Sequence, residues 1–283
     1  MTDYQFKYLS EKIKQAEFQN SPFKHIIIEN FFNKEHFNAI IESKQIHFEK
    51  SPNTETMIDT LYKKGYKTQS FPGCSESIEE YLYSLKSNKW PHERGGTPIE
   101  SFGVTFRLHS FKSFFLKSVV RYLNGDEFHT TLKNKFNINK NTNVITAYQK
   151  NLSKYEISPH PDTRLKALTY LININKDSSI DNEPVHTHLL KFKPEYEYVR
   201  EEWEVNQNYD RCWVPWNWCD SVKVVNKNNS IVLFAPSNDT LHAVKLDYNH
   251  NEFQRTQLYG NLMFANTTKL PQRNYHYYER TNK

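Results

Sequence analysis

Two distant segments of the chain carry side chains that together could hold a metal ion. In YEISPHPDTRLKALTYLININ, residues 155–175, His160 and Asp162 stand two positions apart at the start of a long apolar run. Side chains at i and i+2 of an extended segment point to the same face, so the imidazole and the carboxylate can aim at one point. His242 stands at the start of another strand-like run, in NSIVLFAPSNDTLHAVKLDY. Two imidazoles and one carboxylate can occupy one face of an octahedral metal and leave the other face open.

A cation that could bind an anionic ligand follows on the next segment. Arg255 comes soon after His242, in QRTQLYGNLMF. A guanidinium can bind a carboxylate through two parallel hydrogen bonds. Plainer interpretations also exist: His160 and Asp162 as a hydrogen-bonded pair, His242 as a core histidine, and Arg255 as half of a surface salt bridge.

Other polar residues near these segments are weaker candidates. His186 and His188, in VHTHLL, also have i, i+2 spacing, but no carboxylate stands in a matching strand. Arg164 and Lys166 follow Asp162 directly. They are either solvated charges at the end of a strand, which we favour, or groups that meet an anionic substrate.

The elements that must position these residues change in character after Asn141. Short runs with β-branched or aromatic alternation then follow one another, separated by polar turns. The predicted strands lie within TNVITAYQKN, KYEISPH, LKALTYLININ, VHTHLLKFK, SVKVVNK, NSIVLFAP, LHAVKLDY and RTQLYGNLMFAN. So many strands without intervening helices predict an antiparallel barrel or a double-sheet jelly roll.

The chain before residue 141 is predicted to be mainly helical. His25 to Glu29 is a short Ile-rich strand, and Asn33 is the predicted N-cap of a helix after it. Further helices are predicted over about 75–87, 110–123 and 127–136. We expect one domain over 1–283, in which a helical part, about 1–140, packs on a jelly-roll core, about 141–266, with a polar tail at 267–283.

Four of the five tryptophans stand in one segment between the predicted metal-bearing strands. The stretch from about 177 to 220 is too long for a hairpin turn, so we expect a structured insertion. Its place in the chain makes a lid over the substrate site, over about 195–220, one of its possible roles.

The composition excludes several classes of protein. The net charge of +5 is spread along the chain, with no basic run of the kind found in nucleic-acid-binding tails. No apolar stretch approaches the ~20 residues of a membrane span, and the N-terminus lacks an apolar signal core. Three cysteines do not make a disulfide framework. We therefore expect a cytoplasmic protein without a membrane partner and without a nucleic-acid partner.

The segments around these residues resemble a known family. PHPDTRLKALTYLININ, VLFAPSNDTLHAV and RTQLYGNLMF resemble the iron(II)- and 2-oxoglutarate-dependent dioxygenases, with the prolyl-hydroxylase-like branch nearest. SPFKHIIIENFF also resembles the strand that opens that branch. The likeness extends in outline over about 22–265 and is sharp only around His160, Asp162, His242 and Arg255. The family's fold is a double-stranded β-helix, a jelly roll that is mainly β with flanking helices.

The resemblance implies roles for individual residues. Iron(II) would be bound by His160, Asp162 and His242, with 2-oxoglutarate and O2 as the other cofactors. Arg255 would hold the far carboxylate of 2-oxoglutarate.

Two further residues are implied to help at that carboxylate. Tyr148 resembles a tyrosine of the prolyl-hydroxylase-like branch that contacts it. Gln257 stands where the family often has serine or threonine, so the partner beside Arg255 is either Thr256 or Gln257.

The implied reaction is hydroxylation of a C–H bond in a small molecule or a peptidyl side chain, with release of succinate and CO2. Asp162 favours hydroxylation, because halogenating relatives replace this carboxylate with a small residue. Nucleobase demethylases of the same superfamily usually have a second arginine, which RTQLYGNLMF lacks. A non-catalytic jelly-roll binding protein and a cupin with other metal chemistry are further alternatives. The sequence does not identify the substrate, the position oxidised or the oligomeric state.

Overall fold

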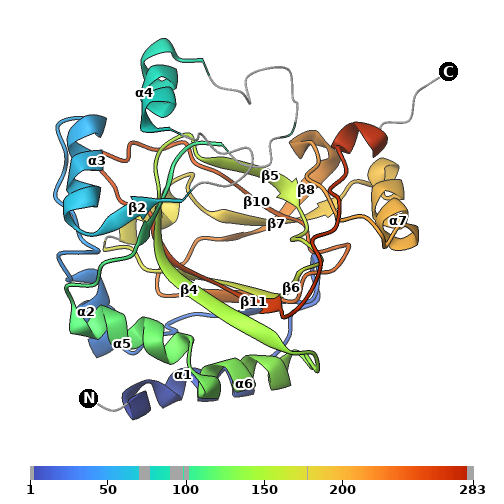
Figure 1. Cartoon of the computed structure of the whole chain (residues 1–283), viewed down its shortest axis with the longest axis horizontal. Coiled ribbons are helices and arrows are strands. Elements are labelled where there is room, and N and C mark those ends of the chain that lie inside the picture. The colour runs from blue at the N-terminus through green and yellow to red at the C-terminus, as the bar shows by residue number, and fades with distance from the viewer. Residues whose placement is uncertain (1–2, 70–76, 90–97, 99–101, 177, 279–283) are drawn as a thin grey trace.

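The computed structural model describes residues 3–69, 77–89, 98, 102–176 and 178–278 of the chain. Two antiparallel sheets lie one over the other, and helices cover the outer face of the larger sheet (Figure 1). This is the two-sheet jelly-roll arrangement of a double-stranded β-helix with flanking helices, as the sequence predicted.

The larger sheet has seven strands, in the order β1-β9-β6-β11-β4-β3-β2. Their bounds are β1 Ile26–Ile28, β2 Tyr66–Thr68, β3 Thr105–Leu108, β4 Thr142–Asn151, β6 Lys166–Asn173, β9 Ile231–Phe234 and β11 Thr256–Phe264. The smaller sheet has the order β5-β10-β7-β8. Its strands are β5 Glu156–His160, β7 Thr187–Phe192, β8 Cys219–Val225 and β10 His242–Lys245. All eight strands predicted after residue 141 are present, because alternating side chains there face two different surroundings.

Seven α-helices accompany these sheets in the described part of the chain. They are α1 Lys7–Gln15, α2 Lys34–Ile41, α3 Thr54–Lys63, α4 Ile78–Ser87, α5 Phe114–Leu123, α6 Asp126–Lys135 and α7 Tyr198–Val205. Helices α1, α2, α5 and α6 lie along the outer face of the larger sheet (Figure 1). A single core cluster joins them to the sheet, with Phe6, Leu116, Phe128, Tyr148 and Leu258 among its buried members.

Capping side chains determine where the predicted helices begin. Asn33 is the N-cap of α2 and accepts a hydrogen bond from the His36 N–H, as expected. Helix α5 begins at Phe114 rather than near 110, because the Ser113 hydroxyl caps it by accepting from the Leu116 N–H. The predicted residues 75 and 76 of the second helix lie outside the described residues.

The N-terminal part is less purely helical than predicted. Strands β1, β2 and β3 all extend the larger sheet, and of these only β1 was expected. Strands of three or four residues are too short to show a period-two pattern. Helices α1, α3 and α7 were also missed. Helix α1, KYLSEKIKQ, has only two buried apolar side chains, Leu9 and Ile13.

The close approach of Tyr170 on β6 requires glycine at position 260 on β11. Gly260 on β11 is the register partner of Tyr170 on β6. A Cβ atom at position 260 would lie 2.0 Å from Cζ of Tyr170, so no larger residue fits while that ring stays in place. The phenol oxygen of Tyr170 is in turn hydrogen-bonded to the Thr146 hydroxyl.

The tryptophan-rich segment is structured, as expected, and it forms a second core cluster. Trp203 on α7 is buried, and its indole Nε1 donates to the Tyr278 hydroxyl at 2.7 Å. Tyr275 packs in the same cluster, against Trp218. Tyr275 and Tyr278, both within the expected polar tail at 267–283, are buried against the insertion.

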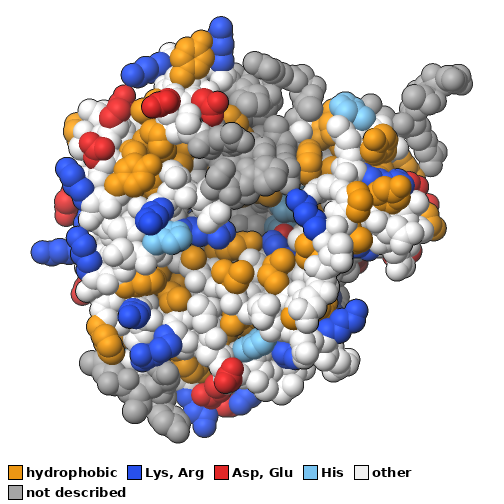
Figure 2. All heavy atoms as spheres, viewed as in Figure 1, with side chains coloured by type: hydrophobic (Ala, Val, Ile, Leu, Met, Phe, Trp, Pro, Cys, Tyr) orange, Lys and Arg blue, Asp and Glu red, His pale blue; other side chains and the backbone are white. Residues whose placement is uncertain are grey.

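Charged side chains are dispersed over the visible surface. On the face shown in Figure 2, basic side chains stand among acidic, polar and apolar ones instead of forming one stripe. Of the described helices, none has the length and apolar character needed to cross a membrane.

Candidate metal centre and its cavity

Neighbouring strands of the smaller sheet bring the predicted ligands together. His160 ends β5, Asp162 follows it in the loop, and His242 begins β10. Strands β5 and β10 are paired antiparallel with His242 directly opposite His160. The two imidazoles therefore lie side by side, with their ring centroids 4.4 Å apart.

The donor atoms converge on one point. Nε2 of His160 is 3.9 Å from Oδ1 of Asp162, and Nε2 of His242 is 3.8 Å from Oδ2. Ligand atoms of all three residues lie within 4.8 Å of one another. The separations are too long for hydrogen bonds. They suit groups that would close around a shared cation.

Both imidazoles present a lone pair to this point. Nδ1 of His160 donates to the Ser158 carbonyl at 2.8 Å, and Nδ1 of His242 donates to the Thr240 carbonyl at 3.1 Å. Burial lowers the pKa of His160 to about 3, and it also lowers the pKa of His242. Each ring is therefore neutral at physiological pH with Nε2 unprotonated, which is the form that binds a metal.

The carboxylate is held by two donors from β6. Lys166 Nζ lies 2.5 Å from Oδ1 of Asp162, and the Thr169 hydroxyl donates to Oδ2 at 2.5 Å. Burial would raise the pKa of Asp162, but the Lys166 ammonium and the two imidazoles lower it well below the ordinary range. Asp162 is thus an anion with lone pairs still available on each oxygen. The preferred interpretation of Lys166 as a solvated charge was wrong, because its side chain reaches back four residues to Asp162.

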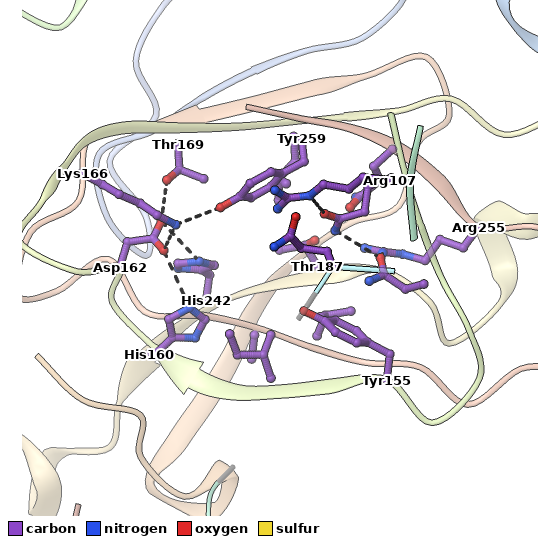
Figure 3. A pocket seen from close by; sticks show the side chains of 18 residues that line it. Arg107, Tyr155, His160, Asp162, Lys166, Thr169, Thr187, His242, Arg255 and Tyr259 are labelled. Carbon is purple, nitrogen blue, oxygen red and sulfur yellow. Dashed lines mark hydrogen bonds and ion pairs between the residues drawn. The ribbon is translucent and has the colours of Figure 1, made fainter. Parts of the chain in front are cut away.

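A cavity of about 360 Å³ extends from these residues between the two sheets. His160, Asp162, Lys166 and His242 stand at one end, and Arg255 stands at the other (Figure 3). Its lining residues are Gln69, Arg107, Gln149, Asn151, Tyr155, Ile157, His160, Asp162, Lys166, Thr169, Leu171, Thr187, His242, Ala243, Val244, Arg255, Gln257 and Tyr259. Thr187 on β7 is one of them, but none of the described residues 195–220, over which a lid was considered, lines the cavity.

Arg255 is a buried cation at the far end of the cavity. Its Nε donates to the Val185 carbonyl at 2.5 Å, and one terminal nitrogen donates to Oδ1 of Asn151 at 2.5 Å. Burial lowers the pKa of its guanidinium to about 10. Within the described residues no carboxylate pairs with it, so the site is suited to a carboxylate supplied by a ligand.

Tyr148 does not reach the cavity, contrary to expectation. It is the register partner of Leu258, and both side chains lie in the core under the helices. The Tyr148 hydroxyl is 3.5 Å from the Leu116 carbonyl of α5. Strand alternation explains the error, because Gln149, next to it on β4, faces the cavity.

The residues after Arg255 alternate in the same way. Gln257 lines the cavity and donates from Nε2 to Oδ1 of Asn173 at 2.8 Å. Thr256 lies on the opposite face, where its hydroxyl accepts from Lys150 Nζ at 2.6 Å. Of the two expected partners at this end, only Gln257 is in position to meet a ligand.

The rival histidine pair does not join the centre. The His186 ring nitrogen Nε2 donates to the Ile180 carbonyl, and His188 is hydrogen-bonded to the Ser221 hydroxyl. Thr187, between them, is the residue that faces the cavity. Arg164 is also outside, because its guanidinium donates to the Trp203 and Tyr209 carbonyls of the insertion.

Several lining residues were not found from the sequence. Arg107 lies on β3 and Gln69 directly follows β2, and neither of these short strands was predicted. Gln149 and Asn151 stand on a predicted strand, and the partnership of β4 with β11 places them beside Arg255 and Gln257. If the pairing of β4 with β11 had been known, the alternation of side chains along both strands would have placed these polar residues on the same face as Arg255.

Comparison with known proteins finds distant structural similarity and no match in sequence. No family model matches the chain, and no curated protein is similar to it in sequence. Among solved structures, a prolyl hydroxylase from Trichoplax adhaerens, in complex with a hypoxia inducible factor peptide fragment, is 10% identical with a TM-score of 0.43, covering 93% of this chain and 90% of that one.

Two bacterial structures are similar in the same way. A Pseudomonas putida prolyl-4-hydroxylase is 10% identical, with a TM-score of 0.37 and coverage of 74% of this chain and 97% of that one. A 2OG-Fe(II) oxygenase family protein from Burkholderia pseudomallei is 9% identical, with a TM-score of 0.35 and coverage of 80% and 98%.

Proposed function

We propose that the chain is an iron(II)- and 2-oxoglutarate-dependent oxygenase that hydroxylates a C–H bond and releases succinate and CO2. One observation carries the proposal. Two neutral imidazoles and one carboxylate converge at one end of a cavity whose other end holds the buried guanidinium of Arg255, which no carboxylate of the described residues pairs with. That arrangement matches a metal chelated by a dicarboxylate.

The residues present fit iron(II). His160, Asp162 and His242 supply the mixed nitrogen and oxygen donors of a facial site, and each is oriented by a second hydrogen bond. When bound, the iron would activate O2. Oxidative decarboxylation of 2-oxoglutarate to succinate and CO2 would supply two of the electrons that reduce O2. Lys166 and Thr169 hold the carboxylate of Asp162 in place for this.

The rest of the cavity would orient the cosubstrate and exclude water. Arg255 would bind the far carboxylate of 2-oxoglutarate, with Gln257 beside it. Asn151 fixes the guanidinium through one terminal nitrogen. Ile157 and Leu171 supply apolar walls from opposite sheets, which lower the local dielectric and strengthen these contacts.

An anaerobic titration tests the proposal. Protein loaded with iron(II) should develop a weak visible charge-transfer band as 2-oxoglutarate is added, because the keto acid chelates the metal. His160→Ala should abolish the band. Arg121→Met, which removes an exposed cation on α5 on the far side of the larger sheet, should leave it unchanged. A band of full intensity in His160→Ala, or none in the unmodified protein, would contradict the proposed function.

A further inference from the structure

The cavity contains more positive charge than the proposed cofactors need. Among the described residues that line it, three are cations, Arg107, Lys166 and Arg255, and one is a carboxylate, Asp162. Iron(II) and 2-oxoglutarate carry opposite charges of equal size, so their binding would leave this excess in place. A surplus of one sign in a low-dielectric cleft attracts ligands of the other sign.

Two of the three cations already have a partner in this arrangement. Lys166 forms an ion pair with Asp162 at 2.5 Å and is hydrogen-bonded to the Tyr259 hydroxyl at 3.0 Å. Arg255 would be paired with the far carboxylate of 2-oxoglutarate. Arg107 is the cation that remains.

Arg107 is held ready for a ligand without being neutralised. Its Nε donates to Oε1 of Gln149 at 3.1 Å, and its guanidinium carbon lies 5.1 Å from the ring centroid of Tyr259. The described parts of the chain place neither a carboxylate beside it nor an acceptor on its two terminal nitrogens. Those terminal nitrogens are the donors that bind a carboxylate or phosphate in two parallel hydrogen bonds.

Arg107 also lies close to the proposed reaction centre. Lys166 Nζ is 5.6 Å from the same Tyr259 centroid, so this one ring contacts both cations. In Figure 3 Arg107 and Tyr259 lie between the metal-ligand end and Arg255. A substrate bound through Arg107 would therefore share the cavity with both the metal and 2-oxoglutarate.

We infer that the primary substrate carries an anionic group, a carboxylate or a phosphate, and that Arg107 binds it. Gln149 and Tyr259 position the guanidinium, as their contacts to Nε and to its face show. The inference rests on the proposed function, and it narrows the substrate to an acid or a phosphate ester in place of a neutral side chain.

Small probes of matched shape test the inference. Protein loaded with Mn(II) and saturated with 2-oxoglutarate, without oxygen, would be titrated with phenyl phosphate and benzoate, with benzyl alcohol as the neutral counterpart. Paramagnetic relaxation of the probe's phosphorus, carbon or protons reports binding near the metal. At least one of the two anions should bind, and the alcohol should bind at least about tenfold more weakly than that anion.

Variants at position 107, with Arg121→Met as the control, test whether Arg107 is the residue that binds the anion. Arg107→Met should weaken binding of the preferred anion at least about tenfold, Arg107→Lys should retain part of it, and Arg121→Met should retain all of it. Calorimetry on the same samples should show 2-oxoglutarate affinity within about threefold of the original in all three. Far-ultraviolet circular dichroism would check that each variant is folded.

The possible failures are distinguishable. Unchanged anion binding in Arg107→Met would place the anion on the metal or elsewhere and overturn the inference. Loss of 2-oxoglutarate affinity in that variant would place Arg107 in the cosubstrate site and overturn it too, as would equal binding of benzyl alcohol. If the unmodified protein bound neither Mn(II) nor 2-oxoglutarate, the proposed function would fail. Titration with phenyl phosphate and benzoate alone would then still show whether Arg107 binds an anion.

Discussion

Replacing Arg255 by methionine should separate ligand affinity from protein stability. The guanidinium lies fully inside the protein, and burial brings its pKa from 12.5 to about 10. A shift of that size corresponds to roughly 3 kcal/mol against the cation while no carboxylate is bound. Methionine would remove this cost, but it would leave Val185 O and Asn151 Oδ1 without their donor, at about 1–3 kcal/mol each. These effects oppose each other, so the free energy of unfolding should change by less than about 3 kcal/mol.

The same substitution should strongly weaken the binding of 2-oxoglutarate. Truncating one partner of a buried charge pair costs about 2–5 kcal/mol. That range corresponds to a roughly 30- to 5,000-fold increase in Kd. Arg255→Lys should lie between, because an ammonium keeps the charge but loses the parallel hydrogen bonds.

Calorimetric titration of the Mn(II)-loaded protein, without oxygen, would measure both 2-oxoglutarate and 2-oxobutyrate, which lacks the far carboxylate. Arg255→Met should weaken only the first ligand, because only that ligand reaches position 255. An affinity for 2-oxoglutarate within threefold of the original, a loss under roughly 0.7 kcal/mol, would refute the role of Arg255. An equal loss for 2-oxobutyrate would show a general distortion of the cavity instead.

Three further substitutions test the packing at Gly260, the pH dependence due to Lys150 and the orientation of Tyr148. Gly260→Ala should lower the free energy of unfolding by about 1–3 kcal/mol in urea titrations, since its Cβ would clash with Tyr170. The same change in a Tyr170→Ala background should cost much less, and equal costs would contradict the clash. Burial lowers the pKa of Lys150 to about 7, so the unfolded chain binds the extra proton between pH 7 and 10.5 and stability should rise with pH there. Lys150→Met should remove up to about 1.4 kcal/mol per pH unit of that rise, and an unaltered slope between pH 7 and 9.5 would be the contrary result. Tyr148→Phe should alter 2-oxoglutarate affinity less than about twofold, as its hydroxyl faces α5; a larger loss would return Tyr148 to the site.

The fold could be predicted where local pattern and environment agree. Every strand predicted within residues 142–266 is present. On β4, for example, Gln149 lines the cavity between the sheets and its neighbour Tyr148 packs in the core under the helices. The three-residue strands β1 and β2 depend on pairing with partners distant in the sequence. Only β1 could be predicted, from its three consecutive isoleucines. Helix α1 was missed because its buried stripe consists of so few apolar side chains.

The site could be predicted only in part, for a similar reason. His160 and Asp162 share a face through their i, i+2 spacing, and His242 could be joined to them because it begins a strand. The orientation of Tyr148 depends on which face of β4 is turned inward, and pairing with β11 decides this. The ion pair between Lys166 and Asp162 depends on the conformation of the turn between β5 and β6. A turn has no repeating side-chain pattern from which this conformation could be predicted.

The most direct test of the metal centre is the position of a bound ion. Anomalous diffraction from crystals grown with Mn(II) and 2-oxoglutarate would locate the manganese without reference to any assumed role. We expect one strong peak bounded by Nε2 of His160, Nε2 of His242 and an Asp162 oxygen, with the far carboxylate of the ligand at Arg255. A peak elsewhere, or these three groups turned away from a fully occupied ion, would contradict this expectation.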